Sequence, residues 1–147
     1  MRTTVADAAS LTTSYADNRV LARVGAGPLA FLFDIQTGSS QAVTVQWEFS
    51  HLAAPSVSDD THWYTPIDQA GAVQNTVAVS SDGRFVVDLG NLHPGTTAGN
   101  FFPSGVPSGV SWMRVSAKIA TANGSSVTIY AIHNPGPASS TATVSAS

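Results

Sequence analysis

The stretch VSWMRVSAKIATANGSSVTIYAIH, residues 110–133, carries the clearest structural signal in the chain. Apolar and polar residues alternate on both sides of Asn123-Gly124, which is the pattern of strands with one buried and one exposed face. Asn-Gly is a favoured pair for a two-residue turn, because both positions need a positive φ. The stretch therefore predicts a β-hairpin at the centre of one sheet. Its inward residues would be Met113, Val115, Ala117 and Ile119 in the first arm and Val127, Ile129 and Ala131 in the second.

The same alternation recurs in shorter segments along the chain. In residues 41–50, four apolar side chains (Val43, Val45, Trp47, Phe49) point one way, and Glu48 lies on the opposite face, solvated or paired across strands. Asp82-Gly83 lies between two further alternating segments and predicts a second hairpin. About eight such strands without helical periodicity predict an all-β fold, an antiparallel β-sandwich or jelly roll with long loops and extended termini.

The chain divides into three parts. Residues 1–17 are small and polar, so we expect an N-terminal arm or loosely held lead-in. Residues 18–133 form the β-sandwich domain, because 147 residues suffice for one domain with its own core. Residues 134–147 form a C-terminal tail, which could add an edge strand here or to a neighbouring subunit. Within the domain, residues 90–109 hold five glycines and three prolines, and loops of that length are usually functional or disordered.

Composition excludes several classes of function. The chain has no cysteine, which removes disulfides, thiolate metal ligands and thiol nucleophiles. Six Lys and Arg residues stand against nine Asp and Glu, so no basic cluster neutralises a run of phosphates, and we expect no nucleic-acid partner. The N-terminus lacks a long apolar run, so we expect neither a signal peptide nor a membrane span. Charged residues make up only 10% of the chain, which leaves little charge repulsion against self-association.

The sequence carries no pattern typical of a catalytic or metal site. The four histidines are His51, His62, His93 and His133, and none of their spacings is that of a metal-binding pair. Asp59-Asp60 is too small a cluster for calcium and is expected to begin a turn or strand. There is neither a Gly-x-Ser-x-Gly elbow nor a phosphate-binding glycine loop. We therefore expect no cofactor, no metal and no enzymatic activity. A hydrolase would need a cleft that joins Glu48 or the aspartates to a histidine.

Six aromatic residues are the candidate interface residues: Trp63, Tyr64, Phe101, Phe102, Trp112 and Tyr130. Trp63 and Tyr64 lie on opposite faces of a short strand, so at least one is near the surface. Trp112 is out of phase with its strand, so it faces outward or lies at a bulge. Such side chains are enriched in protein interfaces. Because flat rings also stack on sugars, a glycan platform is the alternative.

Two segments together resemble structural proteins of tailed bacteriophages. The first is VTVQWEFS, residues 43–50, followed by Asp59-Asp-Thr-His-Trp63. The second is WMRVSAKI, residues 112–119, with its Asn-Gly pair and Val127-Thr-Ile-Tyr130. This layout is similar to that of β-sandwich capsid decoration (cement) proteins over roughly residues 40–133. The layout resembles β-sandwich modules of phage tails and baseplates nearly as well.

The resemblance implies a non-enzymatic virion protein, made in the host cytoplasm, that binds the outer capsid surface where capsomers meet and stabilises the shell. Its partners would be the major capsid protein and further copies of itself, typically as a trimer, without nucleic acid or membrane. The family has no fixed catalytic or ligand motif, so no site residue is carried over. We expect the N-terminal arm, the 90–109 loop and the tail to make the contacts. A carbohydrate-binding module, or a tail or baseplate module, is the alternative function.

Overall fold

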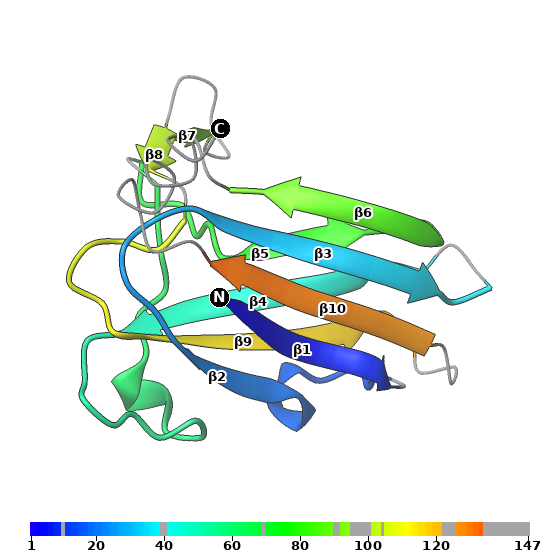
Figure 1. Cartoon of the computed structure of the whole chain (residues 1–147), viewed down its shortest axis with the longest axis horizontal. Helices are drawn as coiled ribbons and strands as arrows, with labels where there is room; N and C mark the ends of the chain where they lie inside the picture. The colour runs from blue at the N-terminus through cyan, green and yellow to red at the C-terminus, as the bar shows by residue number, and fades with distance from the viewer. Residues whose placement is uncertain are drawn as a thin grey trace, which may run out of the picture.

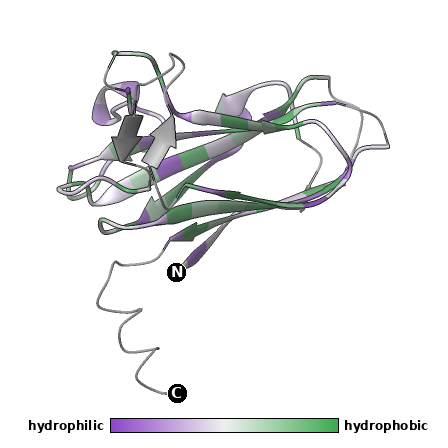
Figure 2. Ribbon diagram, turned by 90° about the horizontal axis from the view of Figure 1, so that it is seen from above, coloured by the Kyte–Doolittle hydropathy of each residue, from purple (hydrophilic) through white to green (hydrophobic). Residues whose placement is uncertain are grey.

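The protein folds as two packed antiparallel sheets, seen edge-on in Figure 2. The computed structural model describes residues 1–9, 11–38, 41–68, 70–89, 92–94, 101–103, 105–121 and 126–133, without the side chains of 9, 92–94 and 101–103. The predicted all-β sandwich of eight strands is confirmed. Two short 3-10 turns, η1 (Tyr15–Asp17) and η2 (Asp60–His62), lie outside the sheets. Across the residues described, no helix has the length and hydropathy needed to cross a membrane.

Each large sheet contains four strands. In sheet A the order is β1 (Arg2–Ala9), β10 (Ser126–His133), β3 (Leu29–Gln36) and β6 (Gly83–Asp88). In sheet B it is β2 (Arg19–Arg23), β9 (Trp112–Ile119), β4 (Val43–Ser50) and β5 (Thr76–Val79). A small third sheet pairs β7 (Leu92–Pro94) with β8 (Phe101–Pro103), inside the predicted 90–109 loop. Figure 1 shows β3 and β10 in front of β4 and β9.

The core lies between the two sheets and is built from the inward face of each strand. β3 and β4 alternate as the sequence predicts, each with four buried apolar side chains on its inner face. The rings of Phe31 and Trp47 meet across the two layers, with their centroids 5.2 Å apart. Burial of this apolar surface is the main force that holds the sheets together.

The predicted hairpin over residues 110–133 is wrong, because its two arms lie in different sheets. β9 pairs with β2 and β4 in sheet B, and β10 pairs with β1 and β3 in sheet A. Both edges of each arm are thus occupied by other strands, and the arms meet only through their buried faces. Alternation identifies which face of a strand is buried, but it does not identify the neighbouring strand. The Asn123-Gly124 pair lies outside the described residues.

The second predicted hairpin, at Asp82-Gly83, is wrong for the same reason. β5 belongs to sheet B and β6 to sheet A, so the turn crosses between the layers. The Asp82 carboxylate accepts hydrogen bonds from the Thr37 hydroxyl at 2.6 Å, from the Thr37 amide at 3.0 Å and from the Gly38 amide at 2.9 Å. These bonds, led by that of the Thr37 hydroxyl, lower the pKa of Asp82. The aspartate thus ties this turn to the connection that follows β3.

The expectation of a loosely held arm over residues 1–17 also needs correction. Residues 2–9 form β1, which pairs antiparallel with β10 through two irregularities in register. Val5 and Leu11 are buried in the core, although the segment around them is small and polar. The Met1 ammonium group donates a hydrogen bond to the His133 carbonyl at 2.7 Å. Two apolar side chains and a ladder partner suffice to hold the segment. The tail, residues 134–147, lies outside the described residues.

Among the eight strands of the two large sheets, the connection from β4 to β5 alone stays within one sheet. The other connections cross between the layers. The β4–β5 connection, residues 51–75, is also long, and this length is what allows it to fold back over its own sheet.

Candidate interaction surface

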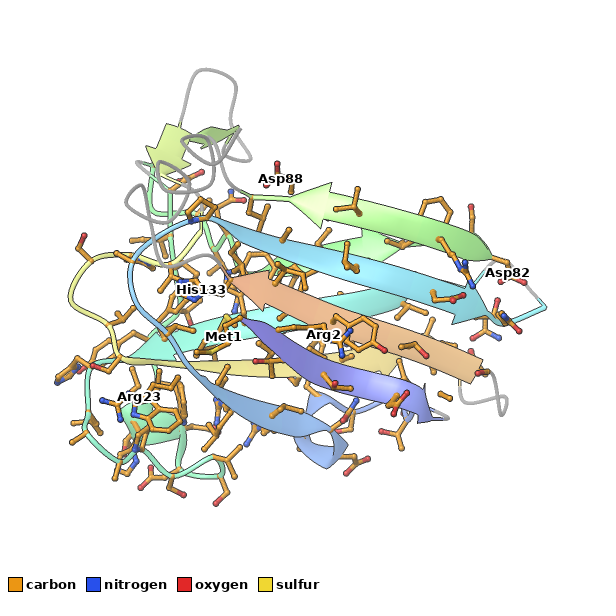
Figure 3. All side chains as sticks on the ribbon, in the orientation of Figure 1. Met1, Arg2, Arg23, Asp82, Asp88 and His133 are labelled. Carbon is orange, nitrogen blue, oxygen red and sulfur yellow. The ribbon has the colours of Figure 1, made fainter. Side chains whose placement is uncertain are left out.

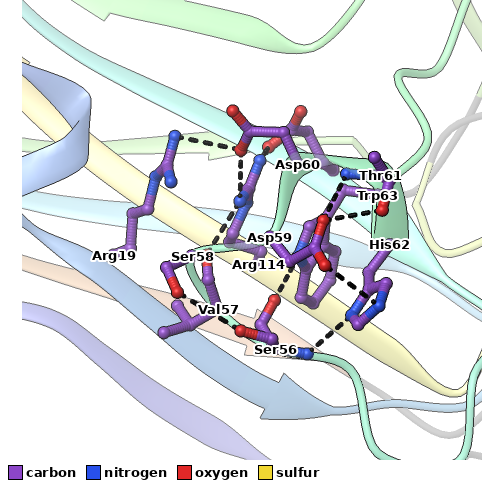
Figure 4. A network of polar contacts seen from close by, with 11 residues as sticks. Arg19, Ser56, Val57, Ser58, Asp59, Asp60, Thr61, His62, Trp63 and Arg114 are labelled. Carbon is purple, nitrogen blue, oxygen red and sulfur yellow. Dashed lines mark hydrogen bonds and ion pairs between the residues drawn. The ribbon is translucent and has the colours of Figure 1, made fainter.

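The outer face of sheet B is covered by the protein's own chain, and we call it the covered face. Glu48 of β4 lies directly opposite Arg114 of β9, and both point outward from the sheet. Arg114 is nevertheless only 3% exposed. The described residues of the β4–β5 connection fold over it, as Figure 4 shows in close view.

Arg114 hydrogen-bonds to the neighbouring strand β4 and to residues 51–75, which we call the covering segment. Its Nε donates to a Glu48 carboxylate oxygen at 2.8 Å, and Nη2 donates to the same oxygen. Its Nη1 donates to the Val57 carbonyl at 2.8 Å and to the Asp60 carboxylate at 2.9 Å. A buried arginine is tolerated only when its donors and charge are satisfied, and these contacts do that. The predicted cross-strand role for Glu48 is therefore confirmed.

Two indole rings fasten the same segment. Trp63 is 7% exposed, donates from Nε1 to the Ser56 carbonyl at 2.8 Å, and has the Arg114 guanidinium 5.0 Å from its ring centroid. Trp112 donates from Nε1 to the Ala53 carbonyl at 3.1 Å. Trp63 is buried and Trp112 is half-buried, and each ring makes one directed hydrogen bond to a carbonyl of the segment.

The Asp59-Asp60 pair begins the short turn η2. The Asp59 side chain accepts hydrogen bonds from the Thr61 hydroxyl at 2.6 Å and the Thr61 amide at 3.0 Å, as an N-cap does. These two bonds, the hydroxyl's first, lower the pKa of Asp59. Asp60 pairs with Arg19 as well as with Arg114. The pair therefore begins a turn, as the sequence predicts.

The outer face of sheet A has the opposite character, and we call it the open face. The register places Leu32 of β3 between Val86 of β6 and Tyr130 of β10. Val86 is 63% exposed and Leu32 is 37% exposed. Apolar side chains that stay exposed at the centre of a regular sheet are the mark of an interaction surface.

Charged side chains flank this apolar row. Asp34 and Arg84 lie opposite each other on β3 and β6, with Arg84 Nε and Asp34 Oδ2 3.0 Å apart. At the other side of the sheet, the Arg2 guanidinium lies 4.6 Å from the centroid of the Tyr130 ring. Figure 3 shows Arg2 on β1 beside β10. An apolar centre with a polar rim is the usual anatomy of a protein interface.

A shallow pocket of about 390 Å³ lies on the open face. Tyr130, Leu32 and Val86 line it from the outward face of the three strands, together with the Asp34–Arg84 pair and Thr128. The full lining is Leu32, Phe33, Asp34, Arg84, Phe85, Val86, Thr128 and Tyr130. The pocket is large enough for a bulky side chain of a partner or for one sugar ring.

The structure separates the six predicted interface aromatics. Tyr130 lies on the open face, whereas Trp63 and Trp112 hold the covering segment. Tyr64 is 58% exposed and its ring lies 5.4 Å from that of His51. The side chains of Phe101 and Phe102, in β8, lie outside the described residues. Trp63 and Tyr64 do not form the predicted short strand, since Tyr64 makes only an isolated bridge with Phe49, but one of the two rings is at the surface as expected.

Sequence reasoning missed Leu32 and Val86. Leu32 lies within Leu29-Ala-Phe-Leu-Phe33, and Val86 within Phe85-Val-Val87, so each stands next to apolar neighbours. An apolar residue that is out of phase in an alternating strand was the available signal. It points outward where a polar residue is normal.

The described residues bring together no group of three His, Asp or Glu side chains that could hold a metal ion. His62 Nδ1 accepts a hydrogen bond from the Ser56 amide at 2.9 Å. His133 is buried at the end of β10, where burial lowers its pKa. No family model matches this chain, and no curated protein is similar to it in sequence.

Proposed function

We propose that this protein is a non-enzymatic structural protein of a virion, a decoration protein that binds the outside of a phage capsid through its open face. One observation carries the proposal: the exposed Leu32 and Val86 lie in a row with the half-buried Tyr130 on sheet A, while the chain covers the outer face of sheet B itself. An exposed apolar row with a charged rim is suited to a protein partner. The phage resemblance of residues 40–133 supplies the kind of partner, a major capsid protein.

We further infer that the sandwich has jelly-roll connectivity. The support is the strand order β1-β10-β3-β6 and β2-β9-β4-β5, in which the first and last strands are neighbours. Jelly rolls occur in viral capsid proteins and also in lectins and cupins. The connectivity is therefore compatible with a virion role, but the function has to be argued from the surface.

The carboxylates that could serve an enzyme are engaged in holding the chain together. Glu48 accepts hydrogen bonds from Arg114, Asp59 caps η2, and Asp82 ties one turn to another. A general acid or base needs a position within reach of a substrate proton. These engagements favour a structural role over a hydrolytic one.

A carbohydrate-binding module is the second candidate, favoured by the pocket on the open face. Tyr130 offers a ring to the apolar face of a sugar, and Asp34, Arg84 and Thr128 offer hydrogen-bonding groups beside it. This reading predicts a specific signal on a glycan array that Tyr130→Ala abolishes. If no glycan on the array binds the protein, the carbohydrate-binding function is contradicted.

The test of the capsid proposal is co-sedimentation with shells. Shells of the phage whose genome carries this gene, prepared without this protein, are incubated with increasing amounts of it. We expect saturable binding at a fixed number of copies per shell. A protein that stays in the supernatant at every concentration would contradict the proposal.

A further inference from the structure

The free edge of β6 is the most regular open edge in the two large sheets. β6 pairs with β3 without any shift in register, and among the described residues no strand pairs with its other side. β1, the opposite edge of sheet A, is interrupted by two irregularities, and Ala8 there has a φ of 48°. In sheet B, the edge strands β2 and β5 have only five and four residues. Bulges and short lengths protect edges from pairing, and β6 has neither protection.

The hydrogen-bond pattern fixes which peptide groups face the free edge. The Leu89 amide donates to the Leu29 carbonyl at 2.8 Å, so the pair formed by these residues is a hydrogen-bonded one. Hydrogen-bonded and non-hydrogen-bonded pairs alternate along an antiparallel ladder. It follows that Arg84, Val86 and Asp88 direct their amides and carbonyls away from β3, toward the outer edge of β6.

The side chains of these same three residues make the edge complementary to itself. Val86, at the centre, is 63% exposed, with Arg84 on one side of it and Asp88 on the other. Figure 3 places Asp88 at the far end of β6 from the turn at Asp82. If two copies of β6 run antiparallel about Val86, each Arg84 lies directly opposite the Asp88 of the second copy. Opposite charges at directly facing positions stabilise a strand pair, and like charges destabilise it.

Other registers lack this match. A slip of two residues brings Arg84 opposite Val86 in one direction and Asp88 opposite Val86 in the other. A slip of four brings Arg84 opposite Arg84 or Asp88 opposite Asp88. Only pairing about Val86 opposes both charged residues with their counter-charges.

We propose that a second copy of this chain pairs with β6 in this register, forming a two-fold dimer. The two A sheets then become one continuous eight-stranded sheet, and the two open faces lie side by side on it. A self-paired strand is an isologous contact and closes at two copies. This assignment replaces the trimer implied by the phage resemblance, and it stands on β6 without resting on the capsid proposal.

The test uses two charge reversals whose homodimers are disfavoured and whose heterodimer is favoured. In Arg84→Asp homodimers Asp opposes Asp, and in Asp88→Arg homodimers Arg opposes Arg. We expect the wild type to sediment as a dimer at high protein concentration and each variant to self-associate at least about tenfold more weakly. An equimolar mixture of the two variants restores opposite charges at both positions, so we expect it to recover the dimer mass. Asp34→Asn, which removes the neighbouring partner of Arg84, is the control and stays dimeric.

A second measurement tests the register itself. The chain has no cysteine, so a single Val86→Cys introduces the only thiol. Hydrogen-bonded pairs have Cα atoms about 5.5 Å apart, within the range that a disulfide bridges. We expect mild oxidation to link Val86→Cys into a dimer, while Thr4→Cys, at the opposite edge of the sheet, stays unlinked.

Four results would overturn the proposal: a monomeric wild type at high concentration, a trimeric mass, charge variants that associate as the wild type does, or a mixture that stays monomeric. Each is distinguishable from failure of the capsid proposal, because shell binding is measured separately on the same variants. Circular dichroism checks that every variant is folded.

Discussion

The two outer faces of this sandwich begin from the same strand alternation and end with opposite surfaces. On the covered face, an outward-pointing arginine is 3% exposed; on the open face, an outward-pointing valine is 63% exposed. The difference comes from one connection. Residues 51–75 fold back over the sheet that they leave, whereas Leu32 and Val86 on the outer face of the other sheet stay exposed. A strand's outward face is therefore not necessarily its wet face, and the connection decides which it becomes.

A buried charge and an exposed apolar row are the two informative departures from a normal protein surface. On the covered face the departure is resolved within the chain, because Glu48 and Asp60 satisfy Arg114. On the open face Leu32 and Val86 remain exposed. The first face stabilises the fold, and the second is available to a partner.

The largest expected effect distinguishes the two faces by stability. Arg114→Ala removes a buried guanidinium, leaves Glu48 without its ion pair and releases the covering segment, so we expect the free energy of unfolding to fall by about 3 kcal/mol. Urea denaturation measures this. The matched control on the open face is Arg84→Ala, whose side chain is 85% exposed and whose loss should cost no more than about 0.5 kcal/mol. If both substitutions lowered the free energy of unfolding equally, the two faces would not differ in their contribution to stability.

A smaller effect concerns one hydrogen bond of the covering segment. Trp112→Phe keeps an aromatic ring, though a smaller one, but loses the donor to the Ala53 carbonyl, which should cost about 1 kcal/mol. Cleavage by a protease within residues 51–62 should become faster, because the segment opens more often. Tyr130→Phe, on the open face, is the counterpart and should change neither quantity. An unchanged cleavage rate in Trp112→Phe would mean that the indole does not hold the segment.

Leu32→Ser tests whether the exposed apolar row on the open face contributes to the stability of the fold. Its side chain lies on the surface of β3 away from the core, so we expect a change in unfolding free energy within about 0.5 kcal/mol. Thermal unfolding measures it. If the free energy of unfolding fell by several kcal/mol, the row would be part of the folded core and not a surface for a partner.

The smallest expected effect is a change in pH dependence at His133. Burial, with a contribution from the N-terminal ammonium group, lowers its pKa below the ordinary 6.5. Below pH 6.5 the unfolded chain therefore binds a proton that the folded chain resists, so stability is full above pH 6.5 and falls as the pH drops. Urea midpoints at pH 7.5 and 5.5 measure the slope. His133→Phe should flatten it, and a slope unchanged in His133→Phe would contradict this assignment.

The sequence predicted the inner faces well, because burial follows alternation directly. Trp47 and Phe31 lie where the pattern places them. It failed on which strands are neighbours, since the arms around Asn123-Gly124 pair with strands far away in the chain. Alternation contains no information about such long-range partners.

The candidate surface was harder to predict than the fold. Tyr130 was named from its residue type, and it does lie on the open face. Trp63 and Trp112 were named on the same grounds, yet they fasten the chain to itself. Whether an outward aromatic is exposed depends on where a long connection folds, which local sequence does not specify. Leu32 and Val86 were missed because their neighbours in the sequence are also apolar, so the outward face of the strand is not marked by polar residues.

The most direct test of the central claim compares one variant from each side of the molecule in the shell-binding assay. Leu32→Asp places a charge in the open face, and Tyr64→Asp places one at an exposed ring on the β4–β5 connection. We predict that Leu32→Asp loses shell binding by at least about tenfold while Tyr64→Asp binds as the wild type does. If Tyr64→Asp loses binding and Leu32→Asp keeps it, the open face is not the surface that contacts the capsid.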